Sequence, residues 1–235
     1  ATIAATDLSN IGGKTTGAVT LASKVRIQGS QSEVATALVG DSSVVASKAN
    51  TEARVTSVVN VNQGEEIAGV NNVQGIFASG LSDSLSSLAS GGNSTAKLNT
   101  ITGDDGDVAI TVSDSAFESS SATLTAADLI AVGGATTGTV TVTNAVKISG
   151  DTSQLTNTLV SSSSSVTASS ALVTVSDAAF TTSSATIAAT TLSDIGGKTS
   201  GTVTVTKAVK ITGATADLTN TLVSGSSLVV AGTAL

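Results

Sequence analysis

The sequence predicts a mainly β fold, a repeat β-solenoid resembling a parallel β-helix, with short helices in its coils and one inserted segment that contains a helix. Two observations carry this prediction. Near-identical segments recur at fixed intervals, and periods of about 20 to 50 residues are typical of stacked repeats. The recurring segments also alternate β-branched and polar residues, which is the pattern of a half-buried strand.

The clearest repeat unit is VTVTKAVKITGATADLTNTL, at residues 203–222. Almost the same string stands at residues 140–159, and a looser copy stands at residues 19–38. Alternation of valine and threonine predicts a strand at the start of the unit, and KIT predicts a second short strand before Gly213. The last part has apolar residues at helical spacing, which predicts a short helix with Thr215 as its N-cap.

The period follows from the starts of the predicted strands, which recur at nearly equal intervals. These starts are Ile110, Val140, Val173 and Val203. We call each predicted turn of the solenoid, from one strand start to the next, a coil. Two types of coil alternate, so equivalent residues recur after every second coil, and we call this interval the two-coil repeat. Stacking of such coils would place like residues on like residues, and we expect Val142, Val175 and Val205 to share one interior ladder.

Three segments are predicted: N-terminal coils at residues 1–48, an acidic insert at residues 49–109, and four further coils at residues 110–235. The insert interrupts the repeat and holds seven acidic residues against two basic ones, a net −5 of the chain's total of −7. Five of its apolar residues have helical spacing, which predicts an amphipathic helix. These residues are Ile76, Phe77, Leu81, Leu85 and Leu88.

Composition argues against several classes of function. The chain has no histidine and no cysteine, so a Ser-His-Asp triad and thiolate chemistry are both excluded. We therefore expect no enzymatic activity and no required cofactor. A net charge of −7 disfavours nucleic acid as a partner, and no apolar run has the length of a transmembrane helix.

Asp104, Asp105 and Asp107 form the best candidate for a metal site, because three carboxylates with intervening glycine can surround a hard cation such as Ca²⁺. The alternative is a solvated acidic turn. Asp114 and Asp177 recur at the same position of the repeat. Stacked aspartates there could bind cations between coils, although such residues more often bond the backbone of their own turn.

The recurring patterns VTVTxAxxITG and VTVSDAAxxxxxATI resemble the Val/Thr/Ala/Ser-rich tandem repeats of large secreted bacterial surface proteins and adhesins, notably those of cyanobacteria. The resemblance covers the chain apart from the insert and implies an extracellular or cell-surface location. It implies a structural role, in a surface layer, a filament or an adhesin stalk.

A polysaccharide-acting enzyme built on a β-helix ranks last, because the chain has no tyrosine or tryptophan to serve as a sugar-binding platform. Two alternatives stay open. One is a binding module, of adhesin or phage-fibre type, that recognises a glycan or partner through residues 49–109. The other concerns partners: Ala1 is equivalent to Ala185 and Leu235 to Leu172, so we expect either head-to-tail self-association into a filament or further repeats of the same polypeptide.

Overall fold

The computed structural model describes residues 1–17, 19–39, 45–47, 51–120, 122–183, 186–232 and 234 of the chain. It is a mixed α/β protein, in which the helices contain more residues than the strands. The prediction of a mainly β solenoid is therefore wrong. Strands that pair in parallel need a crossover between them. The helices expected as short parts of a mainly β coil form these crossovers and make up a larger share of the chain than the strands do.

The chain divides into two compact units. The first contains residues 1–83, 94–111 and 135–139, and the second contains residues 84–93, 112–134 and 140–235. Residues 1–39 and 51–83 thus belong to one unit, and the strand at Thr51–Val55 pairs in parallel with the strand at Arg26–Gly29. The predicted insert accordingly continues the sheet that residues 1–48 begin.

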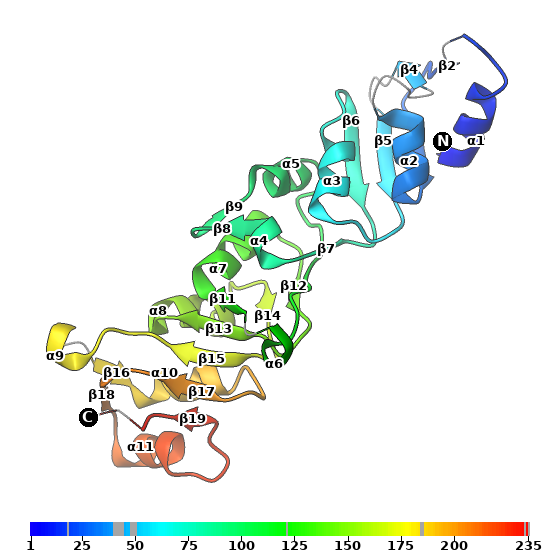
Figure 1. Ribbon diagram of the computed structural model, residues 1–235. Helices are drawn as coiled ribbons and strands as arrows, with labels where there is room; N and C mark the ends of the chain where they lie inside the picture. The colour runs from blue at the N-terminus through cyan, green and yellow to red at the C-terminus, as the bar shows by residue number, and fades with distance from the viewer. Residues whose placement is uncertain are drawn as a thin grey trace. The chain divides into compact units, whose positions relative to one another are not determined.

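The first unit is built on a parallel sheet with the strand order β1-β3-β5-β6, and Figure 1 shows its strands β5 and β6 side by side. Helices α1, α2 and α3 lie in the connections between these strands, with α1 against α2 and α2 against α3. The bounds of its strands are β1 (Thr2–Ala4), β2 (Val19–Thr20), β3 (Arg26–Gly29), β4 (Val45–Ser47), β5 (Thr51–Val55), β6 (Val73–Phe77) and β7 (Leu81–Asp83). Its helices are α1 (Ala5–Gly12), α2 (Gln31–Leu38), α3 (Val61–Ala68) and α5 (Ala96–Asp104).

The second unit is built on a parallel sheet with the strand order β11-β13-β15-β17-β19. Its strands are β11 (Thr123–Thr125), β12 (Val140–Val142), β13 (Lys147–Gly150), β14 (Val166–Thr167), β15 (Leu172–Val175), β16 (Thr186–Ala188), β17 (Val203–Val205), β18 (Lys210–Thr212) and β19 (Val229–Val230). Its helices are α4 (Leu85–Leu88), α6 (Phe117–Ser120), α7 (Ala126–Ala135), α8 (Thr152–Leu155), the π-helix η1 (Thr156–Val160), α9 (Phe180–Ser183), α10 (Ala189–Gly196) and α11 (Thr215–Leu222). The remaining strands are β8 (Ala89–Ser90), β9 (Asn93–Ser94) and β10 (Ile110–Val112).

An aliphatic ladder runs across the main sheet of the second unit. Leu124 pairs with Ile148, Ile148 with Val173, Val173 with Val203, and Val203 with Val229. The first four are buried. Burial of apolar area is the main stabilising term in folding, so this ladder forms the core of the unit.

The predicted valine ladder is correct for one pair and wrong for the third residue. Val175 and Val205 are direct partners in β15 and β17, and both are buried. Val142 is also buried, but it lies in β12, which belongs to a different sheet. Equivalent sequence positions therefore do not all stack on one another.

The amphipathic helix predicted from Ile76 to Leu88 is also wrong. The chain instead forms β6, β7 and the short helix α4 there. Gly80 has a φ of +75°, a left-handed conformation that favours glycine and ends regular structure. Val73, Gly75 and Phe77 alternate as the buried residues of β6, which is the period of a strand.

Candidate functional site

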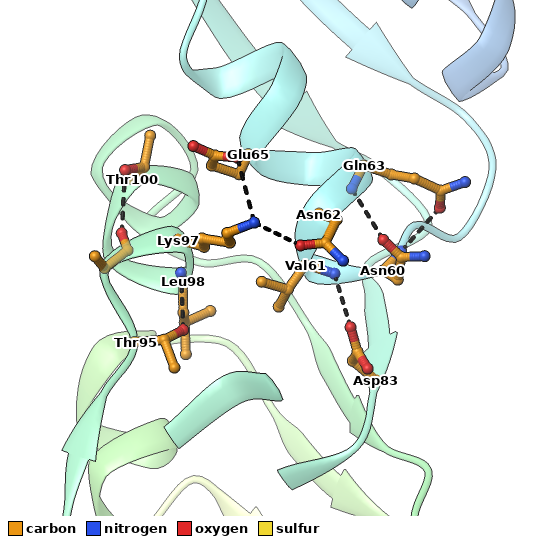
Figure 2. Close-up of polar contacts among 11 residues, drawn as sticks. Asn60, Val61, Asn62, Gln63, Glu65, Asp83, Thr95, Lys97, Leu98 and Thr100 are labelled. Atoms are coloured by element: carbon orange, nitrogen blue, oxygen red, sulfur yellow. Dashed lines mark hydrogen bonds and ion pairs between the residues drawn. The ribbon is translucent and has the colours of Figure 1, made fainter. Parts of the chain in front are cut away.

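The three carboxylates of the predicted metal site lie at the end of α5 and in the turn that follows. Thr95 caps the start of this helix, with its hydroxyl oxygen accepting the backbone N–H of Leu98 at 3.3 Å (Figure 2). Asp104 is the last helical residue and Asp105 is the C-cap. Asp105 is buried, Asp104 is half-buried and Asp107 is exposed.

Two of these carboxylates close the open edge of β6. The Oδ2 atom of Asp104 accepts the backbone N–H of Gly75 at 2.7 Å, and Oδ2 of Asp105 accepts the N–H of Phe77 at 2.6 Å. β6 is the last strand of its sheet, and alternate N–H groups of such a strand have no partner strand. The two aspartates therefore satisfy donors that would otherwise be left unpaired.

Gly75 fits this arrangement because a side chain there would crowd it. A Cβ atom at Gly75 would lie 3.1 Å from the Phe77 ring and 3.4 Å from Oδ2 of Asp104. The glycine thus lets the end of α5 approach the strand closely. Gln74 adds a further link, donating from Nε2 to the backbone carbonyl of Asp104 at 3.2 Å.

Burial makes both carboxyl groups harder to ionise. It raises the pKa of Asp104 above the ordinary value of 3.8, although the bond from Gly75 acts in the opposite direction. It also raises the pKa of Asp105, and neighbouring Asp107 adds to this rise, whereas the bond from Phe77 and the charge of Arg54 lower it. Desolvation of the charged form is the physical cause in both cases.

Within the residues that the structure describes, no group of three or more acidic side chains is placed to hold a metal ion. Oxygens of Asp104 and Asp105 already serve the backbone of β6, so a shared ion would compete with these bonds. Calcium binding at Asp104, Asp105 and Asp107 stays a prediction. If it occurs, millimolar Ca²⁺ should raise the melting temperature by mass action, and Asp107→Asn should abolish that rise without disturbing β6. An unchanged melting temperature would leave these carboxylates with the edge-closing role alone.

A second set of aspartates joins strand ends to helix starts. Asp114 accepts the N–H of Leu85, the first residue of α4, at 2.6 Å. Asp177 accepts the N–H of Thr152, the first residue of α8, at 2.7 Å and its hydroxyl at 2.9 Å. Each of these carboxylates thus bonds a helix distant in sequence, where the sequence suggested a bond within its own turn. Free N–H groups and the positive end of the helix dipole both favour a carboxylate there.

Asp83 plays the same part in the first unit, which the sequence reasoning missed. Its Oδ2 atom accepts the N–H of Val61, the first residue of α3, at 3.1 Å (Figure 2). The signal was present in the sequence, because Asp83, Asp114 and Asp177 each follow a serine at the end of a strand. That recurring Ser-Asp pair marks the carboxylates that cap a helix.

The other acidic side chains of residues 49–109 also have partners. Glu52 forms an ion pair with Arg26 at 2.5 Å, and Glu66 accepts the side-chain amide of Gln31 at 3.2 Å. The ammonium nitrogen of Lys97, in α5, lies 3.9 Å from Oε2 of Glu65 and donates to Oδ1 of Asn62 at 2.7 Å. These two contacts link α5 to α3 (Figure 2). Much of the acidic charge in this segment is therefore engaged within the first unit.

Helices in the described part of the chain are all too short or too polar to span a bilayer. Comparisons of the chain with protein-family models, with curated proteins and with solved structures found no match.

Asp105 provides a direct test of the edge-closing arrangement. Asp105→Ala leaves the Phe77 N–H buried without an acceptor, and we expect a loss of about 1–3 kcal/mol in the free energy of unfolding. Asp105→Asn keeps an oxygen acceptor and removes the desolvated charge, so it should be at least as stable as the parent chain at pH 7.

The pH dependence has a defined sign. A carboxyl whose pKa is higher in the folded state binds protons more readily there, so its contribution to stability falls as pH rises from about 3.8 through the raised pKa. Urea unfolding should show a smaller loss over this range for Asp105→Asn than for the parent, with exposed Asp7→Asn as the control. Equal stability of Asp105→Ala and the parent would contradict the arrangement.

Proposed function

We propose that this chain is a non-catalytic structural protein of the cell exterior, a repeating segment of a surface layer, a filament or an adhesin stalk. The observation that carries the proposal is the recurrence, one two-coil repeat apart, of the contacts that hold the second unit together. The hydroxyl of Thr158 donates to the carbonyl of Ala126 at 3.2 Å, and the hydroxyl of Thr221 donates to the carbonyl of Ala189 at 3.1 Å. Both hydroxyls are buried.

A second kind of contact recurs with the same spacing. The ammonium group of Lys147 lies 4.6 Å from the centre of the Phe117 ring, and that of Lys210 lies 5.4 Å from the centre of the Phe180 ring. Attraction between a cation and an aromatic face contributes about 0.5–1 kcal/mol at exposed sites. Recurrence of the same contacts in successive repeats favours a structural role over a role that depends on one binding or catalytic site.

The location is tested on cells that produce the chain. Antibodies against residues 186–232 should label intact cells, and a cytosolic protein should be labelled only after the cells are made permeable. Labelling of this chain only after permeabilisation would contradict an extracellular structural role.

The alternative of recognition through residues 49–109 has less support. Glu52, Asp83, Asp104 and Asp105 already bond groups of their own unit. A binding surface needs polar groups that are available to a partner. These contacts therefore favour the structural role over a binding module that uses this segment.

Self-association is part of the proposal, and the second unit has an apolar surface suited to it. Leu222, Val223 and Val230 are 38%, 75% and 53% exposed. Leu159 occupies the position of Leu222 in the preceding two-coil repeat and is only 6% exposed. It lies in the helix η1, and α10 packs against that helix. A helix packed against this surface would complete the same contact, and either a second copy of the chain or a further repeat of the same polypeptide could supply that helix.

Val223→Glu should weaken this association. Burial of a valine side chain contributes about 1.5–3 kcal/mol, so we expect the dissociation constant to rise about tenfold or more. Sedimentation velocity over a concentration series measures the effect. Val58, 56% exposed in the first unit, gives the matched control Val58→Glu. A parent chain that stays monomeric at every concentration would exclude association through this surface.

A further inference from the structure

Two surface pockets of the second unit are built from equivalent residues of successive two-coil repeats. The first has a volume of about 250 Å³ and lies between the end of α7 and the serine-rich turn after η1. The second has a volume of about 320 Å³ and lies between the end of α10 and the turn after α11. Both volumes are near the lower end of the range for ligand pockets, about 300–1,000 Å³.

Each turn is held in shape by one serine whose hydroxyl both donates and accepts a hydrogen bond within the turn. Ser164 donates to the carbonyl of Thr158 at 2.5 Å and accepts the N–H of Val166 at 3.1 Å. Ser227 donates in the same way to the carbonyl of Thr221 and accepts the N–H of Val229 at 3.1 Å. These bonds stabilise the turn that forms one side of each pocket.

Other polar groups of the pockets are available for binding. Asn157 lines the first pocket and Asn220 the second, both are exposed, and neither side-chain amide bonds another described residue. Each amide offers two donors and one acceptor. These groups recur at the same place in both pockets, which distinguishes them from isolated surface asparagines.

A pair of serine hydroxyls adds to this set in each pocket. The hydroxyl oxygens of Ser161 and Ser163 are 2.8 Å apart, and those of Ser224 and Ser226 are 2.9 Å apart. Because only one member of a pair donates to the other, one O–H per pair remains to donate outward. Each pocket thus presents both donors and acceptors.

The remaining lining is uncharged and partly aliphatic. Among the described residues, no charged side chain lines either pocket. Val166 lines the first and Val229 the second, and each has one further aliphatic residue, Ile130 or Leu228. A ligand that matches this lining carries hydroxyl groups together with apolar C–H surface and has no net charge.

We propose that these twin pockets bind neutral sugar units of a glycan, one unit in each pocket. Neither pocket has an aromatic side chain on which a sugar ring could stack, so affinity for a single unit should be weak, in the millimolar range. Two equivalent sites on one unit allow a polymer with repeating sugars to occupy both, which raises its apparent affinity without any new contact. This proposal does not depend on the structural role, because binding can be measured on the purified chain.

The test is a titration of the full chain with the neutral trisaccharides maltotriose, cellotriose and mannotriose, followed by NMR of the side-chain amide groups. The amide signals of Asn157 and Asn220 should shift in a saturable manner with at least one of them. Asn157→Ala should remove the response of the first pocket and leave the second, and Asn220→Ala should do the reverse. Because both side chains are exposed, circular dichroism should be unchanged, and exposed Asn71→Ala is the matched control.

Three outcomes would overturn the proposal. One is the absence of any shift at either asparagine with all three sugars at tens of millimolar. Another is an unchanged response of the remaining signals in the double variant Asn157→Ala/Asn220→Ala. The third is equal binding of anionic trigalacturonate, since uncharged pockets should not favour a carboxylated sugar.

Discussion

Val205→Asp should destabilise the chain strongly, with a loss on the order of 4 kcal/mol in the free energy of unfolding. Val205 lies in β17 with 3% of its surface exposed, and its partner in β15 is Val175, with 1% exposed. The substitution would place a carboxylate against this aliphatic surface without a hydrogen-bond donor or a positive charge to compensate it. Removing an ionised carboxylate from water without a partner costs far more than a lost methyl contact.

Thr204→Asp is the matched control for this substitution. Thr204 lies next to Val205 in the same strand but is half-buried, on the opposite face. The same change in charge should therefore cost much less there. Thermal and urea unfolding of both variants measure the difference, and equal stabilities for the two would show that β17 does not bury Val205.

Strand positions could be predicted from the sequence because alternation of β-branched and polar residues is a local signal. The strands predicted to begin near Ile110, Val140, Val173 and Val203 are all present, as β10, β12, β15 and β17. The helix predicted over the end of the repeat unit is also present, as α11. Its N-cap is Ala214 and not Thr215, since the helix begins one residue earlier than the choice of a polar cap implied.

Partner strands could not be predicted, because pairing depends on how the crossovers pack. Val173 pairs with Val203, as the period suggests, but it also pairs with Ile148, which belongs to the other part of the repeat unit. The predicted step of one coil therefore matches the pairing of β15 with β17 but not the pairing of β13 with β15. The α/β class was missed for a related reason: helices were expected only as short parts of the coils, and the short helix expected before Gly133 is part of the ten-residue helix α7.

The roles of the acidic residues needed tertiary information. Asp104 and Asp105 looked like metal ligands because they are close in sequence, yet each bonds a different backbone N–H of β6, a strand that is distant in sequence. No local pattern shows that β6 is an edge strand. The serine-aspartate pairs at Asp83, Asp114 and Asp177 were a readable signal, but the helices that they cap are distant in sequence.

Gly201→Ala should also have a large effect, because the loop before β17 touches the backbone before β15. A Cβ atom at Gly201 would overlap the carbonyl oxygen of Ala171 and lie 2.8 Å from its carbonyl carbon. The loop cannot move away easily, since the hydroxyl of Thr199 donates to that same carbonyl and accepts the N–H of Gly201 at 3.0 Å. Overpacking of this kind costs about 1–3 kcal/mol and occasionally more.

Gly225→Ala is the control, because a Cβ atom at Gly225 meets nothing within 4 Å. Gly138, which occupies the position of Gly201 in the preceding two-coil repeat, has the same close approach to a backbone carbonyl, in its case that of Asp107 in the first unit. Gly138→Ala should therefore be destabilising as well, by a similar amount. Urea unfolding compares the three variants. If Gly201→Ala is no less stable than Gly225→Ala, the loop is not held against the backbone before β15, and the bond from Thr199 to Ala171 would have to be absent in solution.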